Sequence, residues 1–124
     1  MTTYYSKDHE WIRLEKDSCL VGITAYAAEQ LGDITYVELP EVGSEFEQGD
    51  VLCEVESVKA ASEVFAPIAG KVLETNQALF DSPEILNGSP EDAGWIARLE
   101  PKFPGKVEGL FDQAGYRAYL DSLR

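Results

Sequence analysis

The chain has few of the side chains on which catalysis and metal binding commonly depend. It contains one histidine, His9, and two cysteines, Cys19 and Cys53, without a C-x-x-C spacing. A histidine-dependent triad would have to use His9, which directly precedes a predicted strand, where a lone histidine is more often a surface or capping side chain. The two distant cysteines lack the spacing of a metal site. We therefore expect no catalytic residue, no metal and two buried free thiols.

Positive charge and long apolar runs are also scarce. Ten Lys and Arg oppose 23 Asp and Glu, which gives a formal net charge of −13. This balance repels nucleic acid and anionic lipid and favours docking on basic protein surfaces. No apolar run approaches the ~20 residues of a membrane span, and the segment after Met1 resembles neither a signal peptide nor a transit peptide. We expect a cytoplasmic protein of bacterial type that binds neither nucleic acid nor membrane.

Length and composition favour a single domain over residues 1–124. A chain of this length can bury a modest core without help from metals or disulfides. Hydrophobic residues make up 44% of the sequence, which excludes disorder over most of the chain.

The apolar runs predict a mainly β chain with two helices. Polar residues separate the runs at 11–14 and 20–23, which is typical of a hairpin. Thr24 can cap a short helix that Gly32 ends. Further strands are expected at residues 33–39, 51–55, 63–65, 71–75 and 95–99. The pattern of a turn glycine followed by a strand recurs weakly at 32–38 and 70–74, as two similar half-sheets would produce.

The C-terminal half contains more turn signals. Residues 76–94 predict a loop-rich segment that Ile85 and Leu86 anchor to the core. A linker is expected at Pro101, Pro104 and Gly105. Asp112 then begins an amphipathic helix. Its apolar face consists of Tyr116, Tyr119, Leu120 and Leu123, at helical spacing.

One lysine lies at the tip of the hairpin expected between the strands at 51–55 and 63–65. The tip sequence 56–62 is Glu-Ser-Val-Lys-Ala-Ala-Ser. Small neighbours leave room for a modifying enzyme around Lys59, and the Val58 side chain can pin the tip to the body. A covalent prosthetic arm needs an exposed amine on such a rigid base. An ordinary unmodified lysine is the alternative that the position alone leaves open.

Short motifs in a fixed order cover most of the chain. They are S-K-D-H-E-W at 6–11, G-I-T at 22–24, L-G-D-I at 31–34, V-E-L-P-E-V-G at 37–43, E-S-V-K-A-A-S at 56–62, P-I-A-G at 67–70, P-E-I-L-N at 83–87 and G-W at 94–95. On these motifs the chain resembles the H-protein of the glycine cleavage system. The E-S-V-K-A and V-E-L-P-E motifs are highly specific for that family.

The resemblance implies both a fold and a function. The fold is a lipoyl/biotinyl-type barrel-sandwich hybrid with a short helix in the N-terminal half and a C-terminal helix. Lys59 would carry lipoate in an amide bond, within a recognition motif formed by Glu56, Ser57, Val58 and Ala60. The amide removes the lysine charge, so the formal net charge becomes −14.

A family member of this kind is a non-catalytic carrier. It takes an aminomethyl group from the P-protein to the T-protein and presents dihydrolipoyl to the L-protein for reoxidation. Lipoyl-attaching enzymes are the other expected partners, and we expect a monomer.

The resemblance also implies a cleft for the loaded arm, lined by His9, Glu10 and Glu63. Two like charges near one site would favour a bound cation. Gln30 stands where some family members have a histidine, and a neutral amide can hydrogen-bond the arm but cannot titrate. Other departures are Ala93, which precedes the G-W pair, and a weak match over residues 99–110.

Three alternatives remain open at this point. An H-like protein could relay lipoyl or octanoyl groups to other enzymes or serve another sulfur pathway. A biotin carrier shares the fold, but its lysine normally lies between two methionines, whereas Val58 and Ala60 flank Lys59. The third is an unmodified binding module, which would retain its function in Lys59→Arg, or an enzyme in its own right, against which the lack of a pocket motif and of a second histidine speaks.

Overall fold

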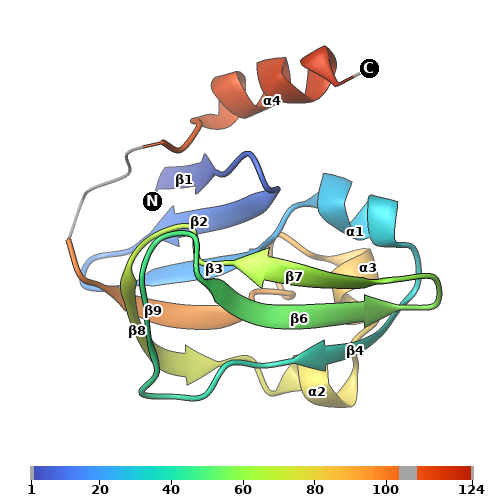
Figure 1. Ribbon diagram of the computed structural model, residues 1–124, viewed down its shortest axis with the longest axis horizontal. Coiled ribbons are helices and arrows are strands. Elements are labelled where there is room, and N and C mark those ends of the chain that lie inside the picture. The colour runs from blue at the N-terminus through green and yellow to red at the C-terminus, as the bar shows by residue number, and fades with distance from the viewer. Residues whose placement is uncertain (1, 104–108, 124) are drawn as a thin grey trace.

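The structure is a computed structural model that describes residues 2–103 and 109–123. Its strands are β1 (Thr2–Tyr5), β2 (Glu10–Leu14), β3 (Cys19–Ile23), β4 (Ile34–Glu38), β5 (Glu45–Phe46), β6 (Val51–Ser57), β7 (Ala61–Phe65), β8 (Gly70–Thr75) and β9 (Ala97–Pro101). Its helices are α1 (Ala25–Leu31), α2 (Ala78–Asp81), α3 (Ile85–Gly88) and α4 (Gln113–Ser122). The mainly β architecture with an early short helix and a C-terminal helix is confirmed (Figure 1).

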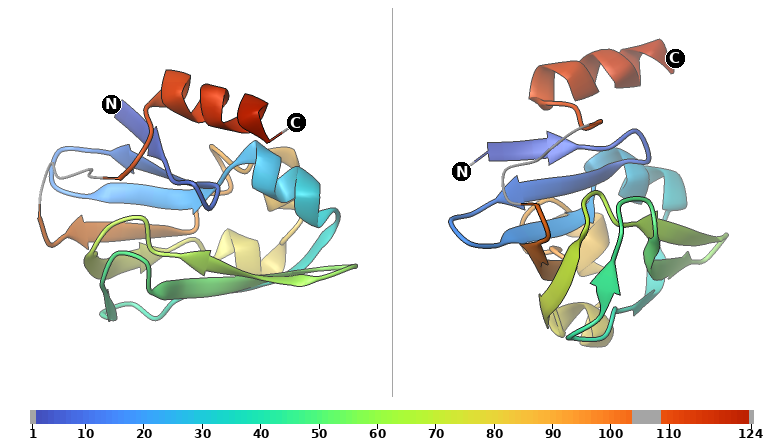
Figure 2. Two further views of the ribbon diagram at one scale, coloured as in Figure 1. Left: turned by 45° about the horizontal axis from the view of Figure 1, so that its top comes forward. Right: turned by 60° about the vertical axis from the view of Figure 1, so that its left-hand side comes forward.

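The strands form two antiparallel sheets around an apolar core. The larger sheet has the order β1-β2-β3-β9-β8-β5, and the smaller has the order β4-β6-β7. Figure 2 shows the smaller sheet layered against the larger one. Ile12 and Val21 of one sheet share a core cluster with Val37 and Val55 of the other, and none is more than 1% exposed. Burial of such aliphatic side chains is the main force that holds the two sheets together.

Both cysteines belong to this core. Cys19 is 0% exposed and Cys53 is 5% exposed, and neither is in a disulfide. The prediction of two buried free thiols is therefore confirmed. Burial raises the pKa of each thiol to about 12.

Strands β6 and β7 form the hairpin that carries the lysine. Their register pairs Glu56 with Ala61, which leaves four residues to make the turn. The Ser57 amide donates to the carbonyl oxygen of Ala60 at 2.8 Å, and the Ser57 hydroxyl accepts from the Ala60 amide at 3.1 Å. The result is a tight tip that projects from the body at the right of Figure 1.

The two predicted helix boundaries follow from their caps. The Thr24 hydroxyl accepts from the Ala27 amide at 3.2 Å at the start of α1, and Gly32 ends that helix with a φ of 79°. Asp112 accepts from the Gly115 amide at 2.7 Å and begins α4. No helix in the described part of the chain is both long and apolar enough to cross a membrane.

The predicted apolar face of α4 is only partly covered. Tyr116 is buried and stacks on Tyr5 of β1, with ring centroids 4.6 Å apart. Tyr119 and Leu120 pack beside it, whereas Leu123 is 46% exposed. The helix therefore docks on β1 through its first two turns.

The sequence did not predict the short elements. Strand β5 is too short to show alternation, and the one-turn helices α2 and α3 lie in the segment expected to be a loop. Strand β1 was missed, and β9 begins two residues later than expected and includes Pro101. Pro104 and Gly105 of the predicted linker lie outside the described residues. Leu86 is fully buried, so the expected anchor of this segment is confirmed.

Candidate functional site

The tip of the β6–β7 hairpin presents Lys59 to solvent. No carboxylate in residues 2–103 and 109–123 lies within ion-pair distance of its amine. The expectation that the Val58 side chain pins the tip is wrong, because that side chain is 69% exposed. The Val58 amide holds the tip instead, by donating to the carbonyl oxygen of Asp33 at 3.0 Å. A backbone bond replaces the apolar contact because the tip extends past the core.

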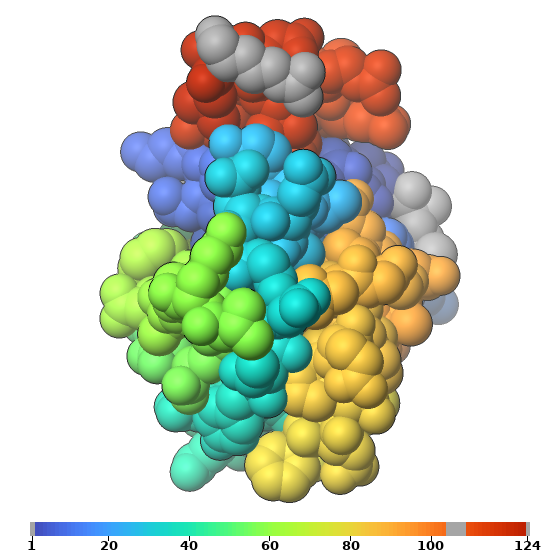
Figure 3. Space-filling view, turned by 90° about the vertical axis from the view of Figure 1, so that its right-hand side faces the viewer, coloured from blue at the N-terminus to red at the C-terminus, as the bar shows by residue number. Residues whose placement is uncertain are grey.

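The Lys59 side chain lies over the end of α1. Its Cε is 3.5 Å, and its Nζ 3.9 Å, from the point where a Cβ on Gly32 would stand. Figure 3 views this end of the molecule, with the green hairpin beside the turquoise segment that follows α1. The root of any group attached to Lys59 is thereby placed beside the helix that lines the neighbouring cleft.

The residues around Lys59 have two different roles, since one closes the turn and the others are exposed. Ser57 closes the turn through the bonds described above, and it also accepts from the Lys59 amide at 3.3 Å. Glu56, Val58 and Ala60 are exposed and face whatever protein approaches the tip. The four residues of the expected recognition motif therefore lie together at the end of β6 and in the turn that follows it.

A cleft of about 180 Å³ opens between α1, strand β7 and the loop before β2. The four residues expected to line it, His9, Glu10, Gln30 and Glu63, are all brought together there. The remaining lining residues are Asp8, Ile23, Tyr26, Ala27, Leu31, Ser62 and Val64. Those from α1 repeat at positions i, i+1, i+4 and i+5, so helical spacing could have identified them from the sequence.

Glu10 is the buried acid of the cleft, with 2% exposure. The Ser6 hydroxyl donates to its Oε1 at 2.5 Å, and the Phe65 amide donates to its Oε2 at 3.2 Å. Burial raises the pKa of Glu10 to about 7, although these two hydrogen bonds oppose the shift. Glu10 can therefore gain or lose a proton near neutral pH. Nothing in the spacing of the sequence had identified Ser6 as its partner.

His9 stands at the rim of the cleft in a left-handed conformation, with a φ of 68°. Burial lowers the pKa of its imidazole, so the ring is neutral at physiological pH. The ring lies 4.5 Å from the ring of Tyr26, measured between centroids. The His9 carbonyl oxygen accepts from the Thr24 amide at 3.0 Å, which ties this loop to the start of α1.

The C-terminal helix braces the same rim. The Tyr116 hydroxyl lies 2.9 Å from Nδ1 of His9 and 2.8 Å from the hydroxyl of Thr24. The sequence predicted Tyr116 as a packing residue only, because nothing in the helical spacing shows what its hydroxyl contacts.

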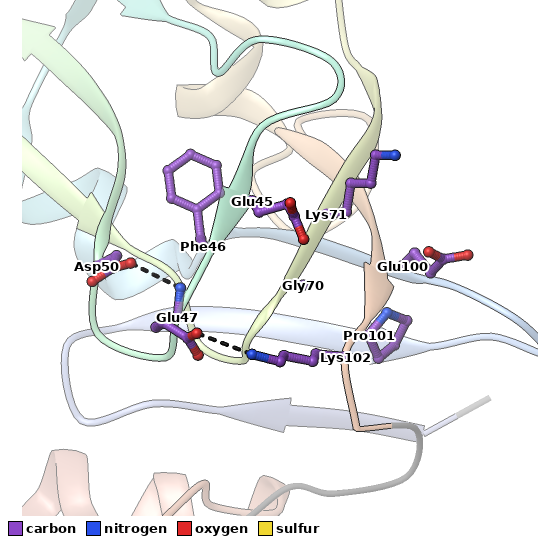
Figure 4. A pocket seen from close by; sticks show the side chains of 9 residues that line it. All are labelled: Glu45, Phe46, Glu47, Asp50, Gly70, Lys71, Glu100, Pro101 and Lys102. Carbon is purple, nitrogen blue, oxygen red and sulfur yellow. Dashed lines mark hydrogen bonds and ion pairs between the residues drawn. The ribbon is translucent and has the colours of Figure 1, made fainter.

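A second hollow, of about 310 Å³, lies at the other end of the molecule (Figure 4). It contains none of the expected site residues. Glu47 and Lys102 pair across it at 3.2 Å, and the Glu47 amide donates to Asp50 at 2.8 Å. Within the described ranges, no group of three or more His, Cys, Asp or Glu is arranged to hold a metal ion.

Comparison with known proteins shows the family of the chain. The family model described as "Glycine cleavage H-protein" matches residues 3–123. A probable glycine cleavage system H protein of Thermococcus gammatolerans is 56% identical over 97% of this chain and 90% of its own length. The glycine cleavage system H protein of Phenylobacterium zucineum is 50% identical over 94% of this chain and 96% of its own length.

A solved structure extends the likeness to the fold. The crystal structure of a glycine cleavage system H protein from Mycobacterium marinum superposes with a TM-score of 0.87, at 36% identity, over 97% of each chain. The expected lipoyl-type barrel-sandwich fold is thereby confirmed. The chain belongs to the glycine cleavage H-protein family.

Proposed function

We propose that this protein is the lipoyl carrier of a glycine cleavage system, with lipoate in amide linkage to Lys59. One observation carries the proposal: an exposed lysine on a tight hairpin, with no ion-pair partner among the residues that the structure describes, lies beside a cleft that contains a buried acid. Family membership supports the same function. Residues 1–124 would form a single carrier unit that acts as a monomer.

The residues of the tip fit an amide-linked group. The amine has room around it, because its neighbours are small or exposed, and acylation would break no ion pair within the described part of the chain. A lipoyl group held on Lys59 would supply thiol–disulfide chemistry. The protein would carry an aminomethyl group from the P-protein to the T-protein and present the dihydrolipoyl form to the L-protein for reoxidation. The chain itself contributes placement and shielding, so it is a carrier and not an enzyme.

The cleft residues fit a small cation. Glu10 and Glu63 supply negative charge, and the neutral His9 adds no repulsion. Ile23, Leu31 and Val64 provide apolar walls that limit access of water. A cation near the carboxylate of Glu10 would favour its ionised form, since opposite charges stabilise each other. The loaded arm would therefore be held by charge and protected from hydrolysis.

The attachment is tested by intact mass and peptide mapping of protein from cells supplied with lipoate. We expect one lipoyl mass on Lys59, and none in Lys59→Arg. Lys71→Arg, which changes an exposed lysine on β8, is the matched control and should be modified like the wild type. An unmodified Lys59 in cells whose other lipoyl proteins are charged would reject the proposal.

The carrier role is tested separately with the lipoylated protein. Mixed with P-, T- and L-proteins, glycine, tetrahydrofolate and NAD, it should support NADH formation, and the Lys59→Arg protein should not. Lipoylation without such activity would favour the alternative in which the protein relays lipoyl groups to other enzymes.

A further inference from the structure

The P-E-I-L-N motif at 83–87 lies outside the proposed site, yet its last residue is tied to it. Helix α3 presents the Asn87 side chain to the segment between α1 and β4. Oδ1 of Asn87 accepts from the Ile34 amide at 2.9 Å, and Nδ2 donates to the carbonyl oxygen of Gly32 at 2.8 Å. Both ends of one side-chain amide thus hold the backbone on either side of Asp33.

The position of β4 explains this contact. β4 is an edge strand of its sheet, and its ladder with β6 is irregular between Ile34 and Tyr36. Among the described residues, no strand lies along the side of β4 that faces away from β6. Because unpaired backbone groups are costly, a side chain that supplies one donor and one acceptor fixes the segment in place.

The fixed segment in turn supports the lysine. The carbonyl oxygen of Asp33, between the two clamped groups, accepts from the Val58 amide at 3.0 Å. Gly32 lies beneath the methylene groups of Lys59. In Figure 3 the turquoise segment lies between the green hairpin and the gold region of α3. A continuous path of contacts therefore runs from Asn87 to the base of the proposed arm.

We propose that Asn87 is a positioning residue for the modified lysine, because its amide clamps the segment that holds the hairpin tip through Val58. The inference rests on the proposed function, since it concerns the lysine to which lipoate is attached. Loss of the clamp frees residues 32–34 and weakens the hold on Val58. A modifying enzyme would then meet a tip that samples several positions, and small misplacements of a reacting group cost much of the rate.

The test uses Asn87→Ala, which removes both hydrogen bonds, and Asn87→Asp, which keeps the acceptor for Ile34 but loses the donor to Gly32. Gln48→Ala is the matched control, because the Gln48 side chain also donates to a backbone carbonyl, that of Pro67 at 3.1 Å. Each protein is modified by purified lipoate ligase with lipoate and ATP, and kcat and KM are measured. Hydrogen exchange is followed at the Val58 and Ile34 amides.

We expect Asn87→Ala to lower kcat/KM for modification about tenfold. Its Val58 amide should exchange several-fold faster, while the core amides of β3 and β9 stay unchanged. Asn87→Asp should keep the Ile34 amide protected but loosen Val58. Gln48→Ala should match the wild type in every measurement.

Three results would overturn the inference. The first is an Asn87→Ala protein with wild-type modification and wild-type exchange at Val58. The second is an equal loss of rate in Gln48→Ala. The third applies if Asn87→Ala loses protection from hydrogen exchange throughout the core, so that only Asn87→Asp can be interpreted. It is an Asn87→Asp protein with wild-type modification and wild-type exchange at Val58. A wild-type protein that the ligase does not modify would instead reject the proposed function.

Discussion

The hydroxyl of Tyr116 lies 2.9 Å from Nδ1 of His9, so the C-terminal helix contacts the rim of the cleft proposed for the arm. The same hydroxyl contacts Thr24, the N-cap of α1. One side chain thereby joins the loop before β2, helix α1 and helix α4.

Tyr116→Phe should loosen this junction without unpacking α4, because the ring stack on Tyr5 is retained. Loss of two partly buried hydrogen bonds should lower the free energy of unfolding by about 1–3 kcal/mol. Urea denaturation measures this change. Tyr119→Phe, which loses one exposed bond to the carbonyl oxygen of Lys7, is the control and should cost less. Equal stability of Tyr116→Phe and the wild type would contradict the bracing role.

Glu10 should make stability depend on pH. Its folded pKa of about 7 exceeds the ordinary glutamate pKa of 4.5, so the folded state binds a proton more tightly than the unfolded state. The contribution of Glu10 to the free energy of unfolding is fully present below its unfolded pKa. It falls by roughly 3 kcal/mol as the pH rises through the folded pKa of about 7. Denaturation curves between pH 4.5 and 8 should show the loss in the wild type and not in Glu10→Gln. A slope that persists in Glu10→Gln would assign the pH dependence to another group.

Gly32→Ala should be destabilising because the backbone there has a φ of 79°. With a ψ of −153° as well, this backbone conformation costs a residue that has a side chain about 1–3 kcal/mol, whereas the added methyl meets Lys59 only at ordinary contact distance. Thermal unfolding should show a lower Tm for Gly32→Ala. Gly88→Ala is a suitable comparison, since open space surrounds its Cβ position, and it should match or exceed the wild-type Tm. Similar losses in the two variants would rule out backbone conformation as the cause.

The two thiols should be unreactive in the folded protein. Burial raises the pKa of Cys19 and Cys53 to about 12, and only the thiolate is a good nucleophile. Iodoacetamide at pH 8 should leave the folded protein unmodified and alkylate both thiols in urea, as mass spectrometry would report. Rapid alkylation without denaturant would mean that a core strand opens readily. Because these thiols are unreactive, neither cysteine should undergo thiol–disulfide exchange with a dithiol attached to Lys59.

The sequence predicted those parts of the fold that depend on local chemistry. The caps of α1 at Thr24 and Gly32, and the paired strands around Lys59, follow from patterns within a few residues. The grouping of His9, Glu10, Gln30 and Glu63 was expected from family resemblance and not from spacing. Helix α3 and strand β5 were missed because elements this short have no measurable periodicity.

Long-range contacts account for the functional residues that were missed. Tyr116 and His9 are 107 positions apart, and Asn87 and Ile34 are 53 apart. No local pattern tells which hydroxyl or amide will meet a distant partner. The Val58 prediction failed for a related reason: sequence shows an apolar residue on a turn, but not that the turn extends beyond the core.

The unpaired amine of Lys59 has a consequence for recognition. Acylation removes a charge there but disconnects no side chain within residues 2–103 and 109–123. As long as the arm lies outside the cleft, the folded body is then alike with and without lipoate on Lys59. A lipoyl-attaching enzyme that must distinguish the unmodified from the lipoylated protein therefore has to detect Lys59 or its appended group directly, because the rest of the carrier responds only when the loaded arm occupies the proposed cleft.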